Sequence, residues 1–268
     1  MTIEAGRTER QYWLDLWRYR ELFYFLAWRD ILVRYKQTVV GVAWAVIRPL
    51  LTMLVLTFIF GKLAKMGSGG VPYPILVFCG MLPWQFFATA FAESGNSLVS
   101  NSGMISKVYF PRMVVPASSV ITSFVDFLIS SVLMGLMMVY YGYAPGASIL
   151  MLPFFVMLAF GMAFGAGLWL SALMVRYRDF RFIVPFIVQF GLYVSPVGFS
   201  SSVVPKEWRW LYSLNPMVGV IDGFRWTILG ERNLYWPGLG ISVVAVIWVI
   251  ISGIWYFRRT ERTFADVI

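Results

Sequence analysis

Hydrophobic residues gather in six long runs, and short polar or charged segments separate them. The runs cover residues 39–60, 74–91 with a polar continuation to 100, 114–140, 149–175, 182–199 and 237–257. A helix that crosses a bilayer needs about 20 residues, within a range of about 17 to 25. The pattern predicts an all-α membrane protein with six transmembrane helices, and an even number of spans places both termini on the same side.

The segment before the first run is amphipathic. If this segment is helical, one face carries Tyr24, Trp28, Ile31 and Tyr35, which follow one another at intervals of four, three and four residues. The Arg and Lys residues lie on the other faces. This arrangement is typical of a helix that lies in the headgroup layer. We predict an N-terminal amphipathic interfacial helix within residues 1–38. It acts either as a membrane anchor or as a gate that admits a substrate from the cytoplasmic leaflet.

Residues 200–236 form neither a clear span nor an ordinary loop. Pro205, Asn215, Pro216 and several glycines interrupt this segment, yet it contains the apolar stretches WRWLYSL and VGVIDGFRWTIL. Non-helical backbone at membrane depth is tolerated only where protein or a water-filled cavity covers it. We therefore predict a re-entrant pair of short helices before the last span, with the turn at Asn215-Pro216, lining an exit on the outer side.

The positions of the charges predict the topology. Only 13% of the 268 residues are charged, against roughly 25% in soluble domains, and the net charge is +9. Most cations fall in segments on one side of the predicted spans: Arg7, Arg10, Arg18, Arg20, Arg29, Arg34, Lys36, Lys107, Arg112, Arg176, Arg178, Arg181, Arg258, Arg259 and Arg262. The other side holds Lys62, Lys65, Lys206, Arg209, Arg225 and Arg232, and Arg48 lies within the first run.

Cations are retained on the cytoplasmic side, so this asymmetry predicts that both termini lie in the cytoplasm and that the chain spans the plasma membrane. It predicts a cytoplasmic N-terminal part with the amphipathic helix (1–38), a six-span domain (39–258) and a cytoplasmic tail (259–268). The basic character follows from topology and contact with membrane lipids, so no nucleic-acid partner is expected.

Few residues are suited to catalysis. The sequence has no histidine, a single cysteine (Cys79) and no GxxxxGK[ST] loop, so we expect no metal, no cofactor and no nucleotide bound by this chain itself. A membrane glycosyltransferase or acyltransferase is disfavoured for the same reason. Glu93 and Asp126 are the acids within the runs. If they converge, they form an ion-coupling site, as in an ion-coupled flippase; otherwise they pair with polar neighbours or a cation and hold helices in register.

Three stretches together resemble one family. RDILVRYKQTVVGVAWAVIRPLL, FCGMLPWQFFATAFAESGNSLVSN followed by ISKVYFPR, and YSLNPMVGVIDGFRWTILG are similar to the membrane subunits of ABC-type polysaccharide exporters, the permeases for O-antigen, capsule and teichoic-acid chains. The resemblance implies a homodimer that exports a lipid-linked glycan, most closely an O-antigen, and two separate ATPase subunits that bind ATP. An ABC permease for a drug or another lipid is the alternative.

The same resemblance assigns roles to individual residues. It implies a coupling helix at residues 101–112 that sits on the ATPase, with contacts from Ile105, Lys107, Phe110 and Arg112. It also implies a gate helix that includes Trp28, Arg29, Arg34 and Tyr35. Aromatic side chains along the channel are expected to contact the sugars, and the candidates are Trp28, Tyr35, Trp84 and Tyr193.

Overall fold

The computed structural model describes residues 9–36, 41–230 and 234–264, and these contain helices but no strand. The α-helices in chain order are α1 (Glu9–Arg18), α2 (Arg20–Lys36), α3 (Gly41–Leu56), α4 (Tyr73–Ser100), α5 (Ser102–Ile105), α6 (Val114–Tyr140), α7 (Leu152–Arg176), α8 (Phe180–Val194), α9 (Arg209–Tyr212), α10 (Pro216–Leu229) and α11 (Trp236–Glu261). A π-helical segment, Thr57–Leu63, continues α3, and a 3₁₀ turn, Ala147–Met151, leads into α7. Two further 3₁₀ turns, Ser201–Val203 and Lys206–Trp208, precede α9. The all-helical prediction is confirmed.

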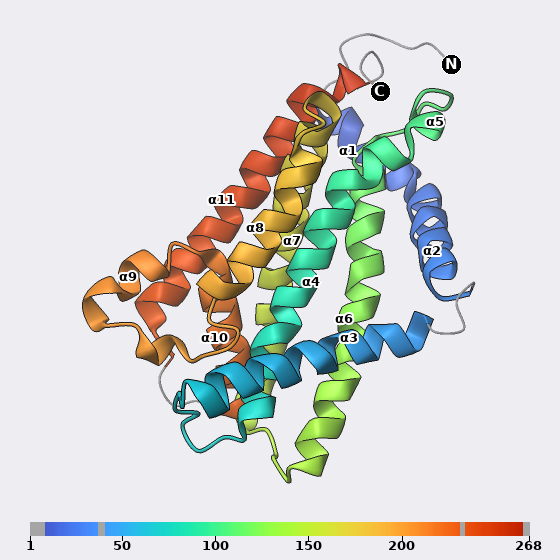
Figure 1. Cartoon of the computed structure of the whole chain (residues 1–268). Coiled ribbons are helices and arrows are strands. Elements are labelled where there is room, and N and C mark those ends of the chain that lie inside the picture. Colours follow the sequence, from blue (N-terminus) through green and yellow to red (C-terminus); the bar gives the residue numbers. More distant parts are fainter. Residues whose placement is uncertain (1–8, 37–40, 231–233, 265–268) are drawn as a thin grey trace.

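Four long helices, α4, α6, α7 and α11, form the body of the molecule (Figure 1). α4 lies at its centre, because 72% of its apolar window is buried within the chain, against 28% or less for the other long apolar helices. Glycines allow α7 to approach two neighbours closely. A methyl group on Gly167 would lie 2.9 Å from the Ser94 hydroxyl of α4, and one on Gly165 would lie 2.8 Å from the Ile250 backbone of α11. Small residues therefore set the spacing of the bundle.

Within the described residues, five helical segments are long and apolar enough to cross a membrane: Val46–Leu63, Tyr73–Ser100, Val114–Tyr140, Ala147–Arg176 and Trp236–Glu261. The predicted fifth span, 182–199, forms the 15-residue helix α8 instead. At about 1.5 Å per residue, α8 is shorter than the ~30 Å hydrocarbon core. It ends where Ser195 adopts an extended backbone, a conformation favoured before Pro196.

The two N-terminal helices lie differently against the long helices. α2 packs lengthwise against α6, and α3 runs across α4 and α6 (Figure 1). Tyr24 and Trp28 do form an exposed aromatic face, with stacked rings 6.4 Å apart. The opposite side of α2 buries Leu26 and Ala27 against the bundle.

The segment before the last long helix contains the two predicted short helices. Asn215 caps α10, because its Oδ1 accepts a hydrogen bond from the Met217 amide at 3.1 Å, and Pro216 begins the helix. Gly230 ends it in the left-handed conformation, φ 65°. α9 protrudes from the side of the molecule (Figure 1), whereas α10 packs against α4, α7 and α11.

Candidate functional site

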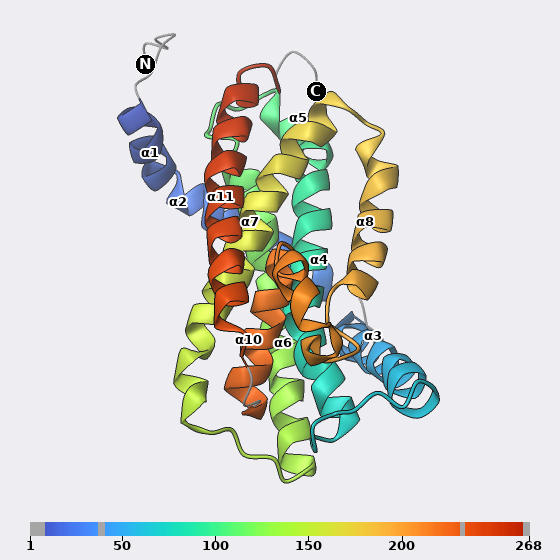
Figure 2. The ribbon, with the colours of Figure 1, turned by 90° about the vertical axis from the view of Figure 1, so that its left-hand side faces the viewer.

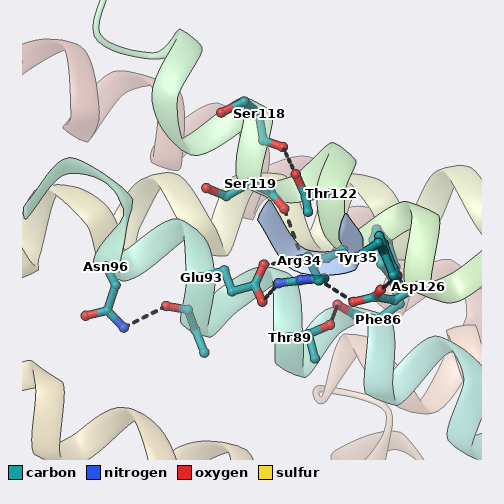
Figure 3. A network of polar contacts seen from close by, with 12 residues as sticks. Arg34, Tyr35, Phe86, Thr89, Glu93, Asn96, Ser118, Ser119, Thr122 and Asp126 are labelled. Carbon is teal, nitrogen blue, oxygen red and sulfur yellow. Dashed lines mark hydrogen bonds and ion pairs between the residues drawn. The ribbon is translucent and has the colours of Figure 1, made fainter. Parts of the chain in front are cut away.

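A cluster of polar side chains joins α2 to the two helices that flank the 101–112 turn (Figure 3). Arg34 of α2 forms ion pairs with Glu93 of α4 and Asp126 of α6. The Tyr35 hydroxyl donates to Asp126, and the Ser123 hydroxyl donates to Glu93 Oε2 at 3.1 Å. We call these five residues the Arg34 cluster. One guanidinium therefore bridges carboxylates on two different helices.

The Arg34 cluster lies along the length of the bundle, away from the ends of α4 and α6, and is partly buried. Glu93 is seven residues before the end of α4, and Asp126 is twelve residues after the start of α6, which corresponds to depths of about 10 and 18 Å. The side chains of Arg34, Glu93 and Asp126 are only 26–34% exposed. Carboxylates at such depth are stable only when a cation or hydrogen-bond donors compensate them. The attraction of Arg34 to both acids accounts for the lengthwise packing of α2.

The two acids do converge, which the sequence raised as a hypothesis, and they pair with a cation that holds helices together. The space between them, where a coupling ion would bind, contains the Arg34 guanidinium. An adjoining cavity of about 260 Å³ is also lined by Arg48, Gln85 and other polar side chains. The geometry thus supports the structural role of the acid pair and not an ion-coupling site.

A second contact joins α2 directly to the 101–112 turn. Arg29 donates from Nη2 to Asn101 Oδ1 at 3.0 Å and pairs with Asp30 at 2.7 Å. Asn101 in turn donates to the Ser97 carbonyl at 2.8 Å, at the end of α4. α2 is consequently attached to both arms of the α4–α6 hairpin and to the turn between them.

The 101–112 turn contains only one short helix, α5, and two of its apolar residues, Ile105 and Phe110, point inward. Ile105 and Phe110 are each 4% exposed, and they belong to a buried cluster that includes Leu26 of α2 and Phe257 of α11. The chain itself thus buries these two side chains, and their contact with an ATPase subunit stays a prediction. Their apolar character follows from this internal packing.

Arg112 has an internal partner as well. Its amide donates to Glu261 Oε1 at 2.9 Å, and its guanidinium donates to the Glu261 carbonyl oxygen. Nearby, Arg258 lies over the Tyr12 ring of α1 at 4.3 Å. Burial, together with the Glu261 charge, raises the pKa of Tyr12 above its ordinary value. Arg112 thus anchors the turn to the end of α11 rather than presenting a contact surface.

The outward surface of the turn consists of Ser106, Lys107, Val108 and Tyr109, all of which are exposed. Lys107 is the predicted ATPase contact that lies on this surface. The turn shares one end of the molecule with the α7–α8 connection and the end of α11 (Figures 1 and 2). The cations predicted to be cytoplasmic in these three segments are accordingly brought together.

The four predicted channel aromatics differ in how exposed their side chains are. Trp28 is 49% exposed and Tyr193 is 56% exposed, so both are available to a substrate, while Tyr35 belongs to the Arg34 cluster. Trp84 is only 6% exposed and packs against Phe87 and Gly191. Trp84 thus fills the contact between α4 and α8 in this chain, and its place along the channel stays a prediction.

Arg225 of α10 is a residue whose importance the sequence did not reveal. It is fully buried, and its guanidinium donates to the Phe199 carbonyl at 2.7 Å and the Val197 carbonyl at 3.0 Å. These carbonyls belong to the non-helical segment that follows α8. Arg225 therefore satisfies backbone acceptors that burial would leave without partners. The signal for it in the sequence is the presence of an arginine within the apolar stretch VGVIDGFRWTIL.

Among the described residues, no group of three or more His, Cys, Asp or Glu side chains is placed to hold a metal ion. The polar contacts described above centre on α2. α2 bears an exposed aromatic face, it is held by charged contacts, and those contacts lead to a turn with an exposed surface.

Comparisons with known proteins agree with this arrangement. Residues 21–229 match the family model described as ABC-2 type transporter. The chain is 28% identical over 260 residues to the O-antigen export system permease protein RfbA of Myxococcus xanthus, covering 95% of this chain and 98% of the relative. It is 26% identical over 241 residues to the RfbA protein of Klebsiella pneumoniae, covering 90% and 92% of the two chains.

The polysialic acid transport protein KpsM of Escherichia coli is 21% identical over 236 residues, with 87% of this chain and 91% of the relative covered. The family model extends from α2 through α10, and so includes the Arg34 cluster, the 101–112 turn and the fully buried Arg225. The chain belongs to the ABC-2 type transporter family.

Proposed function

We propose that this chain is the membrane subunit of an ATP-driven exporter that moves a lipid-linked polysaccharide, of the O-antigen type, from the cytoplasm across the plasma membrane. Its relatives are named for O-antigen export and polysialic acid transport, which supports the polysaccharide as the cargo. The sequence lacks a phosphate-binding loop, so ATP hydrolysis is assigned to a separate ATPase subunit. Two copies of this chain form the transport path, and both termini face the cytoplasm.

The observation that supports a gating mechanism is the three-point attachment of α2. Arg34 holds α2 to α4 and α6, and Arg29 holds it to Asn101. The exposed surface at residues 106–109 is where the ATPase subunit docks in this mechanism. When ATP binding displaces the turn, the ends of α4 and α6 move relative to each other. Because α2 is attached to both, the displacement shifts α2 or separates its ion pairs.

In this mechanism α2 is the gate. With the Arg34 cluster intact, α2 remains against α6 and the path is closed. When the cluster opens, Trp28 and its aromatic face move away from the bundle and the lipid-linked glycan enters from the cytoplasmic leaflet. Aromatic rings stack weakly on the apolar faces of sugar rings, which lets a polymer slide past Trp28 and Tyr193 without being trapped.

The test is to isolate the chain from its native membrane in mild detergent and to identify the proteins that remain bound. We expect a stoichiometric ATPase subunit, and we expect cells depleted of the chain to retain the polysaccharide in the cytoplasm. A chain that isolates alone and transports in liposomes without ATP would contradict the proposal. A complex that contains the ATPase but moves a drug and no glycan would correct the cargo only.

A further inference from the structure

A second cavity lies at the end of the bundle that carries the 101–112 turn. Its volume is about 390 Å³, and it lies between the end of α4, the start of α5 and the α7–α8 connection. Figure 2 shows these segments at the same end of the molecule as the last turn of α11. None of the Arg34 cluster lines this cavity, so it is separate from the site described above.

Two arginines, Arg178 and Arg181, lie on one side of the cavity, and Ser100 and Ser102 lie on the other. Among the described residues that line it, none is acidic. Both arginines are exposed, so their guanidinium groups are available to a ligand. Paired guanidinium groups with hydroxyl donors match the oxygens of a phosphate group, which arginine binds through parallel hydrogen bonds.

The rest of the cavity wall consists of three apolar residues and one amide side chain, Asn96. Met174 and Val175 are buried side chains of α7, and Val99 is half exposed at the end of α4. A free inorganic anion gains nothing from such a wall, whereas the glycerol and first methylene groups of a lipid do. Basic pockets between membrane helices on the cytoplasmic side are a recurrent setting for anionic headgroups.

The backbone does not supply the donors here. The amides of Phe180, Arg181 and Phe182 already donate to carbonyl oxygens of the preceding turn, at 3.0–3.3 Å. Recognition therefore depends on the side chains, which makes it accessible to substitution. We propose that this cavity binds the phosphate headgroup of an anionic membrane lipid, with Arg178 and Arg181 as the principal ligands.

The position of the cavity connects a bound lipid to the turn that α2 contacts. Ser100 and Ser102 flank Asn101, the residue that Arg29 of α2 contacts. A bound headgroup would thus join the α7–α8 connection to the turn that carries the outward surface. The binding site does not depend on the proposed export function, and a failure of either leaves the other standing.

The experiment measures binding of phosphatidylglycerol to the purified full-length chain by native mass spectrometry, with phosphatidylcholine as the neutral comparison. The pocket variant is R178Q/R181Q. The matched control is R176Q/R259Q, which removes two cations from the same end of the molecule, where Arg176 and Arg259 lie over the Tyr177 and Trp255 rings instead of lining the cavity. Comparable thermal unfolding of both variants confirms that they are folded.

We expect R178Q/R181Q to bind phosphatidylglycerol about tenfold more weakly than the control variant, because two charged hydrogen-bond donors are lost. The lysine variant R178K/R181K retains the charge but not the paired geometry and should bind with intermediate affinity. Equal binding by R178Q/R181Q and R176Q/R259Q would overturn the proposal. Displacement of phosphatidylglycerol by inorganic phosphate at equal concentration would overturn the assignment to a lipid, since the apolar wall would then contribute nothing.

Discussion

Arg34 and Asp126 are 92 positions apart in the chain and form an ion pair that holds α2 against α6. The same guanidinium pairs with Glu93 of α4, so one cation compensates two carboxylates. The members of this cluster are therefore not equivalent. Removal of Arg34 leaves two partly buried acids facing each other, whereas removal of either acid leaves a balanced pair.

The substitution Arg34→Gln should destabilise the protein by about 2 kcal/mol and should release α2 from the bundle. Cys79 is fully buried and is the single cysteine, so its reaction with a maleimide dye on heating reports unfolding. Hydrogen exchange of residues 20–36 reports the release of α2. Glu93→Gln and Asp126→Asn should each have a smaller effect, and R34Q/E93Q/D126N should be less destabilised than R34Q because no unpaired charge remains.

The matched control is Arg18→Gln. Arg18 also pairs with an acid, Asp15, but at 3.9 Å and with its side chain 80% exposed. Exposed ion pairs contribute little, about 0–1 kcal/mol, so this variant should unfold like the wild type. Unchanged hydrogen exchange of α2 in Arg34→Gln would show that the cluster does not hold the helix.

The helices were predictable because hydrophobic runs and capping residues are local signals. Asn215 and Pro216, for example, mark the start of α10 by their own chemistry. The Arg34 cluster was only partly predictable. Glu93 and Asp126 stand out as acids in apolar runs, but a sequence does not state which cation will reach them. That depends on how α2 packs against α4 and α6. Helical periodicity identifies which residues share a face of α2, but not which helix that face contacts.

The same limit applies to the turn and to Trp84. Apolar residues in a short connection, such as Ile105 and Phe110, are equally consistent with docking on a partner and with packing into the chain. The positions of Leu26 and Phe257 show that both side chains pack into the chain. A tryptophan in a span can likewise face a path or a neighbouring helix, and Gly191 provides the gap that Trp84 fills.

The contact between Arg29 and Asn101 should transmit movement from the turn to α2. Arg29→Gln removes the donor that reaches Asn101 Oδ1, so we expect the ATPase subunit to remain bound while export falls by up to about tenfold, as the loss of one charged hydrogen bond allows. Surface polysaccharide and ATP hydrolysis are measured on the same cells and membranes. Arg20→Gln is the control, because Arg20 is an exposed residue of the same helix that donates to the nearby Trp17 carbonyl. Equal losses in both variants would contradict this role for Arg29.

The outward and inward residues of the 101–112 turn should give opposite phenotypes. K107E/Y109A changes two exposed side chains, so it should abolish co-purification of the ATPase subunit without altering unfolding. Phe110→Ala empties a buried position and should cost about 3–5 kcal/mol, as large-to-small core substitutions of phenylalanine do. Co-purification yield and Cys79 reactivity distinguish the two effects. Normal ATPase binding by K107E/Y109A would place the docking surface elsewhere.

The contact between α7 and α11 can be tested with a single methyl group. At Gly165 the added carbon would lie 2.8 Å from the Cα and amide nitrogen of Ile250. A backbone cannot move aside as a side chain can, so Gly165→Ala should force the helices apart and destabilise the protein by about 1–3 kcal/mol.

Gly135 of α6 is the matched control, because a methyl group there meets no atom within 4 Å. Gly135→Ala should be neutral or stabilising by up to about 1 kcal/mol, since alanine favours the helix. Equal unfolding temperatures of the two variants would mean that α7 and α11 are not packed this closely.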